Sequence, residues 1–203
     1  QAEPIEGTVL LKGPFDTAWK QLREPAEAGP GTRFSTDGRS RAFLELFEGS
    51  TVQLYSNTEL VLNESQRGRF DEANQKIVLT LNRGRLAVGL AHSANEESRH
   101  LEIATPTGRI LLLEGSYVIE TFADERVEVL VRRGKATFFS GGEIAEVGAG
   151  GRGGYGPNMT PSGDLPTLSP LVLDSLLARP LNLSPWRAFI ETESGPTGRV
   201  IET

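Results

Sequence analysis

The sequence lacks cysteine altogether, which excludes disulfide scaffolds, thiolate metal sites and cysteine nucleophiles. It has only two histidines, His92 and His100, and both flank the polar stretch around Glu96-Glu97. A metal site needs converging ligands. A serine nucleophile often lies in a Gly-x-Ser-x-Gly motif, which the chain does not have. We therefore interpret both histidines as solvated loop residues and expect no catalytic residue, no metal and no cofactor.

Long hydrophobic runs and a basic excess are missing as well. No apolar run approaches the roughly 20 residues that span a bilayer. The net charge of -6 and the pI near 5.1 argue against nucleic-acid binding. The chain begins Gln1-Ala2-Glu3-Pro4, without an initiator methionine or a leader. We expect an extracytoplasmic piece, periplasmic or at the cell surface, that contacts the membrane only through an anchoring N-terminal segment missing from this sequence.

The abundant residues are those that make turns, with 23 glycines and 12 prolines, which favours many short strands. Between Ser40 and Leu54, Ala42, Leu44 and Leu46 alternate with Phe43, Glu45 and Phe47, and after Gly49 the pattern resumes with Val52 and Leu54. The same strand, Glu-Gly-Ser and strand pattern returns between Arg109 and Val118, around Gly115. Alternation with a period of two indicates strands with one buried face, and glycine suits a turn with positive φ. We predict that the two glycines occupy equivalent turns of a repetitive β architecture.

These signals predict one all-β domain over residues 1–150, a twisted β-solenoid-like stack of short strands. A hairpin is expected at Asp37-Gly38, and turns are expected at Asn82–Arg85 and Arg132–Lys135, because each contains glycine beside polar residues. The residues predicted to face inward are Ala42, Leu44, Leu46, Val52, Leu54, Leu79, Leu81, Val118, Val129 and Val131.

Composition divides the rest of the chain. Glycine is dense over 148–156 and proline, serine and glycine follow, so we predict a Gly/Pro-rich linker over 151–168. Ser169 and Pro170 suit the N-cap and first position of a short helix that Pro180 ends. Residues 169–203 are predicted to form this C-terminal helix and a tail. Its leucines cannot be buried within one short helix, so we expect the segment to dock on the β domain.

The order of the motifs from Ile5 to Gly150 resembles the FecR domain, a bacterial extracytoplasmic module. The matching residues are Ile5-Glu6-Gly7-Thr8-Val9, Trp19, Gly31-x-x-Phe34-x-Thr36, Ser40-Arg41-Ala42-x-Leu44-x-Leu46-x-x-Gly49-Ser50-x-Val52-x-Leu54, Leu81-x-x-Gly84-x-Leu86, Thr105-Pro106, Gly115-Ser116-x-Val118, Val129-x-Val131-x-x-Gly134 and Val147-x-Ala149-Gly150. The sequence departs from the family pattern at Glu120, where an apolar residue is expected, and at Ser116, which replaces the usual threonine.

The resemblance implies an all-β fold and a role as a sensor or interaction module. The founding type of the family relays the state of a receptor to a sigma factor across the inner membrane. It carries a small receptor-contacting subdomain after this domain, and Leu181–Thr203 is too short to supply one. We expect a non-catalytic module for sensing or interaction at the cell envelope, with an envelope protein or an acidic glycan as partner. The alternative is a structural or envelope-glycan-binding β module, and an enzyme is not expected.

The basic turns are the recurring feature outside the predicted core. Arg83 and Arg85 flank one glycine, and Arg132 and Arg133 precede another. If the chain winds as a solenoid, equivalent turns would stack on one edge and form a cationic strip on an acidic protein. We predict that these four arginines contact the partner. The alternative is that they only keep edge strands soluble.

Overall fold

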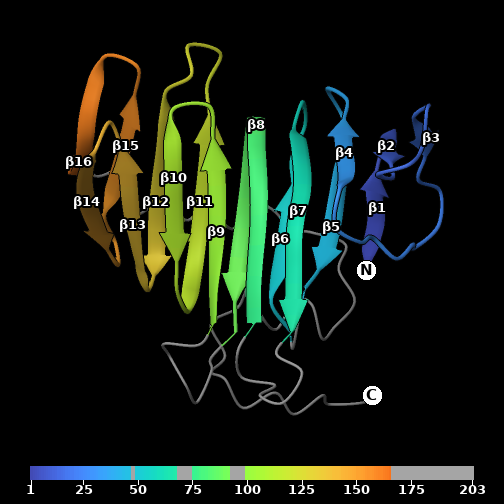
Figure 1. The fold of residues 1–203 in the computed structure, drawn as a ribbon, viewed down its shortest axis with the longest axis horizontal. Helices are drawn as coiled ribbons and strands as arrows, with labels where there is room; N and C mark the ends of the chain where they lie inside the picture. The colour runs from blue at the N-terminus through green and yellow to red at the C-terminus, as the bar shows by residue number, and fades with distance from the viewer. Residues whose placement is uncertain (47–48, 68–74, 92–98, 166–203) are drawn as a thin grey trace.

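The computed structural model describes residues 1–46, 49–67, 75–91 and 99–165, and the described chain is all β, as predicted. Sixteen strands form one open sheet that folds over into two layers, here called sheet A and sheet B (Figure 1). In the described part of the chain, no helix is long and apolar enough to cross a membrane. The predicted C-terminal helix and tail lie outside the described residues.

The two sheets share one strand, β8 (Gln75–Leu90), which begins in sheet B and ends in sheet A. Sheet A otherwise contains β1 (Ala2–Glu6), β5 (Arg41–Glu45), β6 (Thr51–Leu54), β11 (Gly115–Thr121), β12 (Val127–Arg133), β15 (Arg152–Gly156) and β16 (Met159–Leu165). Sheet B contains β2 (Val9–Lys12), β3 (Lys20–Gln21), β4 (Thr32–Thr36), β7 (Glu59–Arg67), β9 (Arg99–Thr105), β10 (Gly108–Leu112), β13 (Lys135–Ser140) and β14 (Glu143–Gly148).

Hairpins lie in both layers. The hairpins β5–β6, β11–β12 and β15–β16 lie in sheet A, and β9–β10 and β13–β14 lie in sheet B. The strands therefore advance along the molecule in chain order, as Figure 1 shows by colour. Nearly all described pairs are antiparallel, with β8–β9 the parallel pair. A solenoid is not confirmed, because its coils would stack parallel strands.

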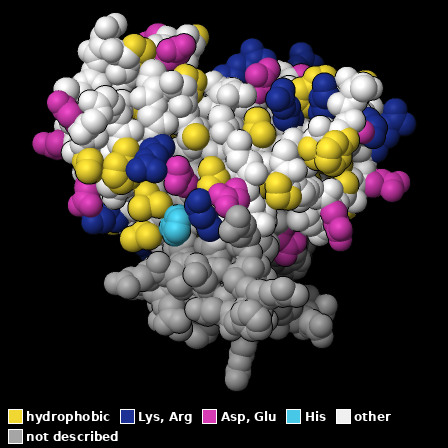
Figure 2. Space-filling model, in the orientation of Figure 1, with side chains coloured by type: hydrophobic (Ala, Val, Ile, Leu, Met, Phe, Trp, Pro, Cys, Tyr) yellow, Lys and Arg dark blue, Asp and Glu magenta, His cyan; other side chains and the backbone are white. Residues whose placement is uncertain are grey.

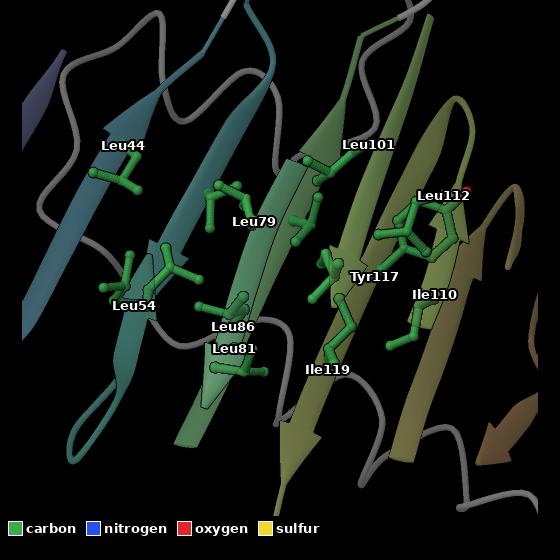
Figure 3. Packing of buried hydrophobic residues seen from close by; sticks show 14 of the residues in the cluster. Leu44, Leu54, Leu79, Leu81, Leu86, Leu101, Ile110, Leu112, Tyr117 and Ile119 are labelled. Carbon is green, nitrogen blue, oxygen red and sulfur yellow. The ribbon is translucent and has the colours of Figure 1, made fainter. Parts of the chain in front are cut away.

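The core lies between the two sheets. Of the residues predicted to face inward, all but Val118 belong to its buried cluster or, like Leu46, pack against it. Figure 3 shows leucines and isoleucines from both sheets meeting there, with Tyr117 beside Leu112. Phe138 of sheet B and Tyr155 of sheet A contact each other with ring centroids 5.8 Å apart. This packing of one sheet on the other makes the inner faces mostly apolar, with Thr32 and Thr36 of β4 and Thr121 of β11 as buried polar exceptions.

Several glycine turns predicted from the sequence prove to be crossovers between the sheets. Gly49 and Gly115 both have positive φ, as predicted, with values of 82° and 153°. They are not equivalent, however, because Gly49 lies in the β5–β6 hairpin whereas Gly115 lies where the chain passes from sheet B to sheet A. Gly38 likewise lies between β4 of sheet B and β5 of sheet A, so the expected hairpin at Asp37-Gly38 is wrong.

The predicted turn at Asn82–Arg85 is also wrong, because β8 continues through it. Gly84 has a φ of 95° and marks the point where this strand leaves sheet B for sheet A. A Cβ on Gly84 would meet Thr58, whose hydroxyl accepts a hydrogen bond from the Arg85 amide at 3.0 Å. The glycine therefore permits a bend and a close contact between strands and does not reverse the chain.

The predicted linker is wrong up to Leu165, because β15 and β16 occupy most of residues 152–165. Their glycines serve packing. A Cβ on Gly153 would overlap the Phe138 ring, and a Cβ on Gly154 would overlap the Val127 carbonyl oxygen. Glycine-dense composition indicated flexibility, whereas here it allows a strand to approach its neighbours closely.

Candidate functional site

One row of side chains crosses the outer face of sheet A, which is turned away from sheet B. Strand register places Phe43 opposite Gln53, Gln53 opposite Ala87, Ala87 opposite Val118, and Val118 opposite Leu130. We call these five residues the outer row. Because side chains alternate along a strand, the neighbours of these residues in the chain point into the core. The prediction that Val118 faces inward is therefore wrong, since Tyr117 and Ile119 on either side take that role.

Three members of the outer row are buried although they face outward, whereas Ala87 and Leu130 are half-buried. Phe43, Gln53 and Val118 are only 3%, 2% and 3% exposed. None of the three belongs to the core cluster, and every described strand lies in one of the two sheets, so no described strand covers them. Both amide atoms of the Gln53 side chain are buried without a hydrogen-bond partner. Such a group costs about 1–3 kcal/mol in an apolar setting.

The outer face of sheet B behaves differently. Its corresponding row runs through Val61, Thr80, Ala104, Arg109 and Phe139, and each of these residues is half-buried or exposed. Arg109 lies over the Phe139 ring at 4.6 Å from its centroid. Figure 2 shows the side of the molecule on which β7, β9 and β10 lie nearest the viewer, with hydrophobic side chains scattered among charges of both signs. Of these two rows, only the one on sheet A therefore carries fully buried side chains, at Phe43, Gln53 and Val118.

A row of ion pairs runs beside the outer row on sheet A. The Arg85 guanidinium donates to Glu120 at 2.7 and 3.1 Å. On the next strand Glu128, which lies opposite Glu120, pairs with Arg126 at 3.1 Å and with Arg152. Two carboxylates facing each other would repel, but here each has its own arginine. The departure from the family pattern at Glu120 is thus matched by a cation on the neighbouring strand.

Tyr117 joins two crossovers between the sheets. Its hydroxyl lies within 3.0–3.2 Å of the carbonyl oxygens of Leu113, Glu114 and Lys135 and of the Lys135 amide. Burial raises the pKa of Tyr117 to about 12, since the charged phenolate would lose its hydration. Burial also raises the pKa of Tyr155, which hydrogen bonds Thr105 at 2.9 Å. Both phenols are therefore neutral structural groups at physiological pH.

The arginines predicted to contact a partner do not form one strip. Arg83 pairs with Glu59 at 2.6 Å, Arg85 with Glu120, and Arg133 with Glu114 at 3.7 Å, while Arg132 is engaged as well. In sheet A, Gly84 is level with Thr121, whereas Arg133 is level with Ser116 at the other end of β11. The two basic segments lie at opposite edges, about 16 Å apart along the strands. The expected stacking is wrong, and contact of these residues with a partner stays a prediction.

The remaining chemistry-bearing residues do not converge. His100 is the second residue of β9, and His92 lies outside the described ranges. Among the described residues, no three histidine or acidic side chains are placed to hold a metal ion together.

The prediction from sequence missed the outer row, although a signal for it was present. Strands buried on one face alternate, but Ala42-Phe43-Leu44, Tyr117-Val118-Ile119 and Val129-Leu130-Val131 are apolar at three consecutive positions. Consecutive apolar residues in a strand indicate burial on both faces. Three such triplets, on β5, β11 and β12 of one sheet, therefore indicate a second buried layer on sheet A.

The fold defines a two-layer, all-β domain. The family model described as FecR protein matches residues 32–137, more than half of the sequence, and the chain belongs to the FecR family. This confirms the resemblance found in the motifs. No curated protein gives a significant match.

Two crystal structures of a candidate anti-sigma factor from Parabacteroides distasonis share the fold. They superpose with TM-scores of 0.51 and 0.50 at 15% and 14% sequence identity. Each match covers 64% of this chain and 57% of that protein, so the chain spans little more than half of its length. At this identity the likeness concerns the arrangement of the strands.

Proposed function

We propose that the chain is a non-catalytic binding module of a signal-transduction system at the cell envelope, outside the cytoplasm. Membership of the FecR family and the fold shared with a candidate anti-sigma factor support a regulatory role. The module acts by holding a protein segment on the outer face of sheet A. Binding there changes which surfaces the partner protein exposes. No covalent bond is made or broken.

The outer row carries this proposal. Phe43, Val118 and Leu130 give one side of the face an apolar strip, and the neighbouring row gives it charges of both signs. An apolar centre with a charged rim is the usual build of a protein–protein contact. The strip is also rigid, because it lies on central strands whose other face is the core.

The test is photo-cross-linking from the full chain in the envelope of the source organism. A photoreactive residue replaces Ser116 on the outer face of sheet A or Ser35 on the outer face of sheet B. We expect one protein, identified by mass spectrometry, to be cross-linked from Ser116 and not from Ser35, and to be lost when Val118→Arg is added. Equal products from both sites, or none, would contradict the proposal.

The predicted role of the arginines is tested alongside. A variant with Arg83, Arg85, Arg132 and Arg133 changed to glutamate is compared with wild type at low and high ionic strength. The amount of cross-linked partner protein is measured in each case. If it falls in this variant and at high ionic strength but is unchanged by Val118→Arg, the partner contacts the basic residues, since exposed charges are screened by salt.

One observation favours the alternative of a glycan-binding module. Phe15 is 98% exposed and Trp19 is 43% exposed, and both lie between β2 and β3 beside the Lys20–Asp16 ion pair. Exposed aromatic rings can stack on sugar rings. Binding of envelope glycans that is abolished by Phe15→Ala together with Trp19→Ala, and unaffected by Val118→Arg, would support this alternative.

A further inference from the structure

The outer row continues to the last described residue of the chain. Leu130 lies opposite Arg152, and Arg152 lies opposite Leu165, where β16 ends. The chain therefore leaves sheet A at one end of the row that leads to Phe43. The residues that follow begin next to the surface that no described strand covers.

The sequence after Leu165 has the length and composition to cover that surface. Six strand spacings separate Leu165 from Phe43, a path of about 29 Å. Thirty-eight residues follow Leu165. The predicted helix of residues 169–179 alone is about 16 Å long, and the residues beyond it reach the rest. The apolar residues available for the contact are Leu171, Val172, Leu173, Leu176, Leu177, Leu181, Leu183, Trp186, Phe189 and Ile190.

We propose that residues 166–203 dock on the outer row of sheet A within the same chain. Docking gives the apolar segment a surface and accounts for the low exposure of Phe43 and Val118, which face away from the core. The unpartnered Gln53 amide opposes the docking, because an apolar cover leaves it without water. The contact is thus weakened at its centre, which suits a segment that can be displaced.

The regulatory consequence rests on the proposed function. A partner that binds the outer row must first displace the chain's own C-terminal segment, so the segment acts as a built-in competitor. The segment is linked to the domain, so its effective concentration at the outer row is high. A partner must bind the outer row tightly enough to overcome the segment's affinity at that concentration.

Paramagnetic broadening in the full chain tests the docking without any partner. The chain has no cysteine, so Ser116→Cys and Ser35→Cys each give one site for a nitroxide label. Ser116 lies on the face of the outer row, two residues before Val118, and Ser35 lies on the outer face of sheet B. We expect amide signals from residues 166–190 to lose most of their intensity with the label at 116 and to keep it with the label at 35.

Two further samples make the result decisive. Adding Val118→Arg to the Ser116-labelled chain should restore the signals, while the dispersed signals of the β domain stay in place. Isotope-labelled chain mixed with nitroxide-labelled unlabelled chain should show no broadening. Broadening in the mixture would mean that a second copy occupies the row, and signals unaffected by either label would mean a free segment; each overturns the proposal. Because no partner is present, failure here leaves the proposed function standing, and failure of the cross-linking test leaves the docking standing.

Discussion

At the scale of single residues, Gln53 is the clearest exception to the rule that buried polar groups find partners. It lies in the middle of β6 with inward-facing Val52 and Leu54 on either side, and its own side chain faces outward. Polar residues at such positions are tolerated when water reaches them. At 2% exposure water does not, so the side chain opposes whatever covers it.

We predict that Gln53→Met stabilises the full chain. Methionine has a similar shape and leaves no amide unsatisfied, so the gain should be about 1–3 kcal/mol. In a chain of this size each kcal/mol raises the melting temperature by about 2–4 °C. Calorimetry measures the shift, and Gln21→Met on exposed β3 is the matched control, for which we expect little change. A Gln53→Met chain that melts lower than wild type would contradict the account.

Tyr117 differs from Gln53, because its buried hydroxyl both donates and accepts hydrogen bonds. Removing the hydroxyl in Tyr117→Phe deprives the Lys135 amide of its acceptor, and it removes the single proton for which the carbonyl oxygens of Leu113, Glu114 and Lys135 are the available acceptors. We predict a loss of about 1–3 kcal/mol at neutral pH, measured by urea denaturation. Tyr155→Phe removes only the bond to Thr105 and should cost less.

Because of Tyr117, we also predict that the free energy of unfolding falls in alkali. Burial raises the pKa of Tyr117 to about 12, against about 10 in the unfolded chain, so only the unfolded state releases the proton between these values. Stability is then lost as pH rises from 10 towards 12, with about 1.4 kcal/mol lost at pH 11 from this tyrosine. Tyr117→Phe should flatten the dependence of the unfolding free energy between pH 8 and pH 11. An unchanged slope would show that Tyr117 is not the group responsible.

At the scale of elements, the crossovers between sheets depend on glycines that a hairpin also uses. Gly134 connects β12 of sheet A with β13 of sheet B and has a φ of 90°. Gly142 lies in the β13–β14 hairpin with a φ of 83°. The backbone conformations are alike, but a Cβ on Gly134 would overlap the Glu114 carbonyl oxygen and the Tyr117 hydroxyl, whereas Gly142 faces open space.

We predict that Gly142→Ala costs about 1 kcal/mol, the effect of positive φ alone. Gly134→Ala should cost a further 1–3 kcal/mol, because a backbone carbonyl and a buried hydroxyl must move. Denaturant unfolding of both variants isolates the close approach from the backbone conformation. Equal losses would show that the crossover has room for a side chain.

At the scale of the whole molecule, the outer row is a surface that no described strand covers. We predict that a chain ending at Leu165 self-associates, because exposed apolar strips on rigid sheets promote contact between copies. Sedimentation velocity should show a monomer for the full chain and larger species for the shortened one. Val118→Arg in the shortened chain should restore the monomer. A shortened chain that stays monomeric and equally stable would mean that the outer row needs no cover.

The sequence by itself determined the strands, most of the inward faces and the family. Alternation such as that of Val52-Gln53-Leu54 and Leu79-Thr80-Leu81 is a local property, because a strand with one buried face must repeat every two residues. The positive φ at Gly49 and Gly115 was equally local. These features depend only on the residue and its neighbours in the chain.

Only the tertiary structure decided which strands pair and which faces are covered. A glycine needs the same backbone freedom whether the next strand stays in the sheet or crosses to the other one, so Gly38, Gly84 and Gly134 could not be assigned from sequence. Glycine at 153 and 154 suits flexibility and close packing alike, and the closeness of the Phe138 ring and of the Val127 carbonyl on the neighbouring strand decided for packing. The ion pairs of Arg83 and Arg85, and the burial of Val118 on an outward face, depend on partners far away in the chain.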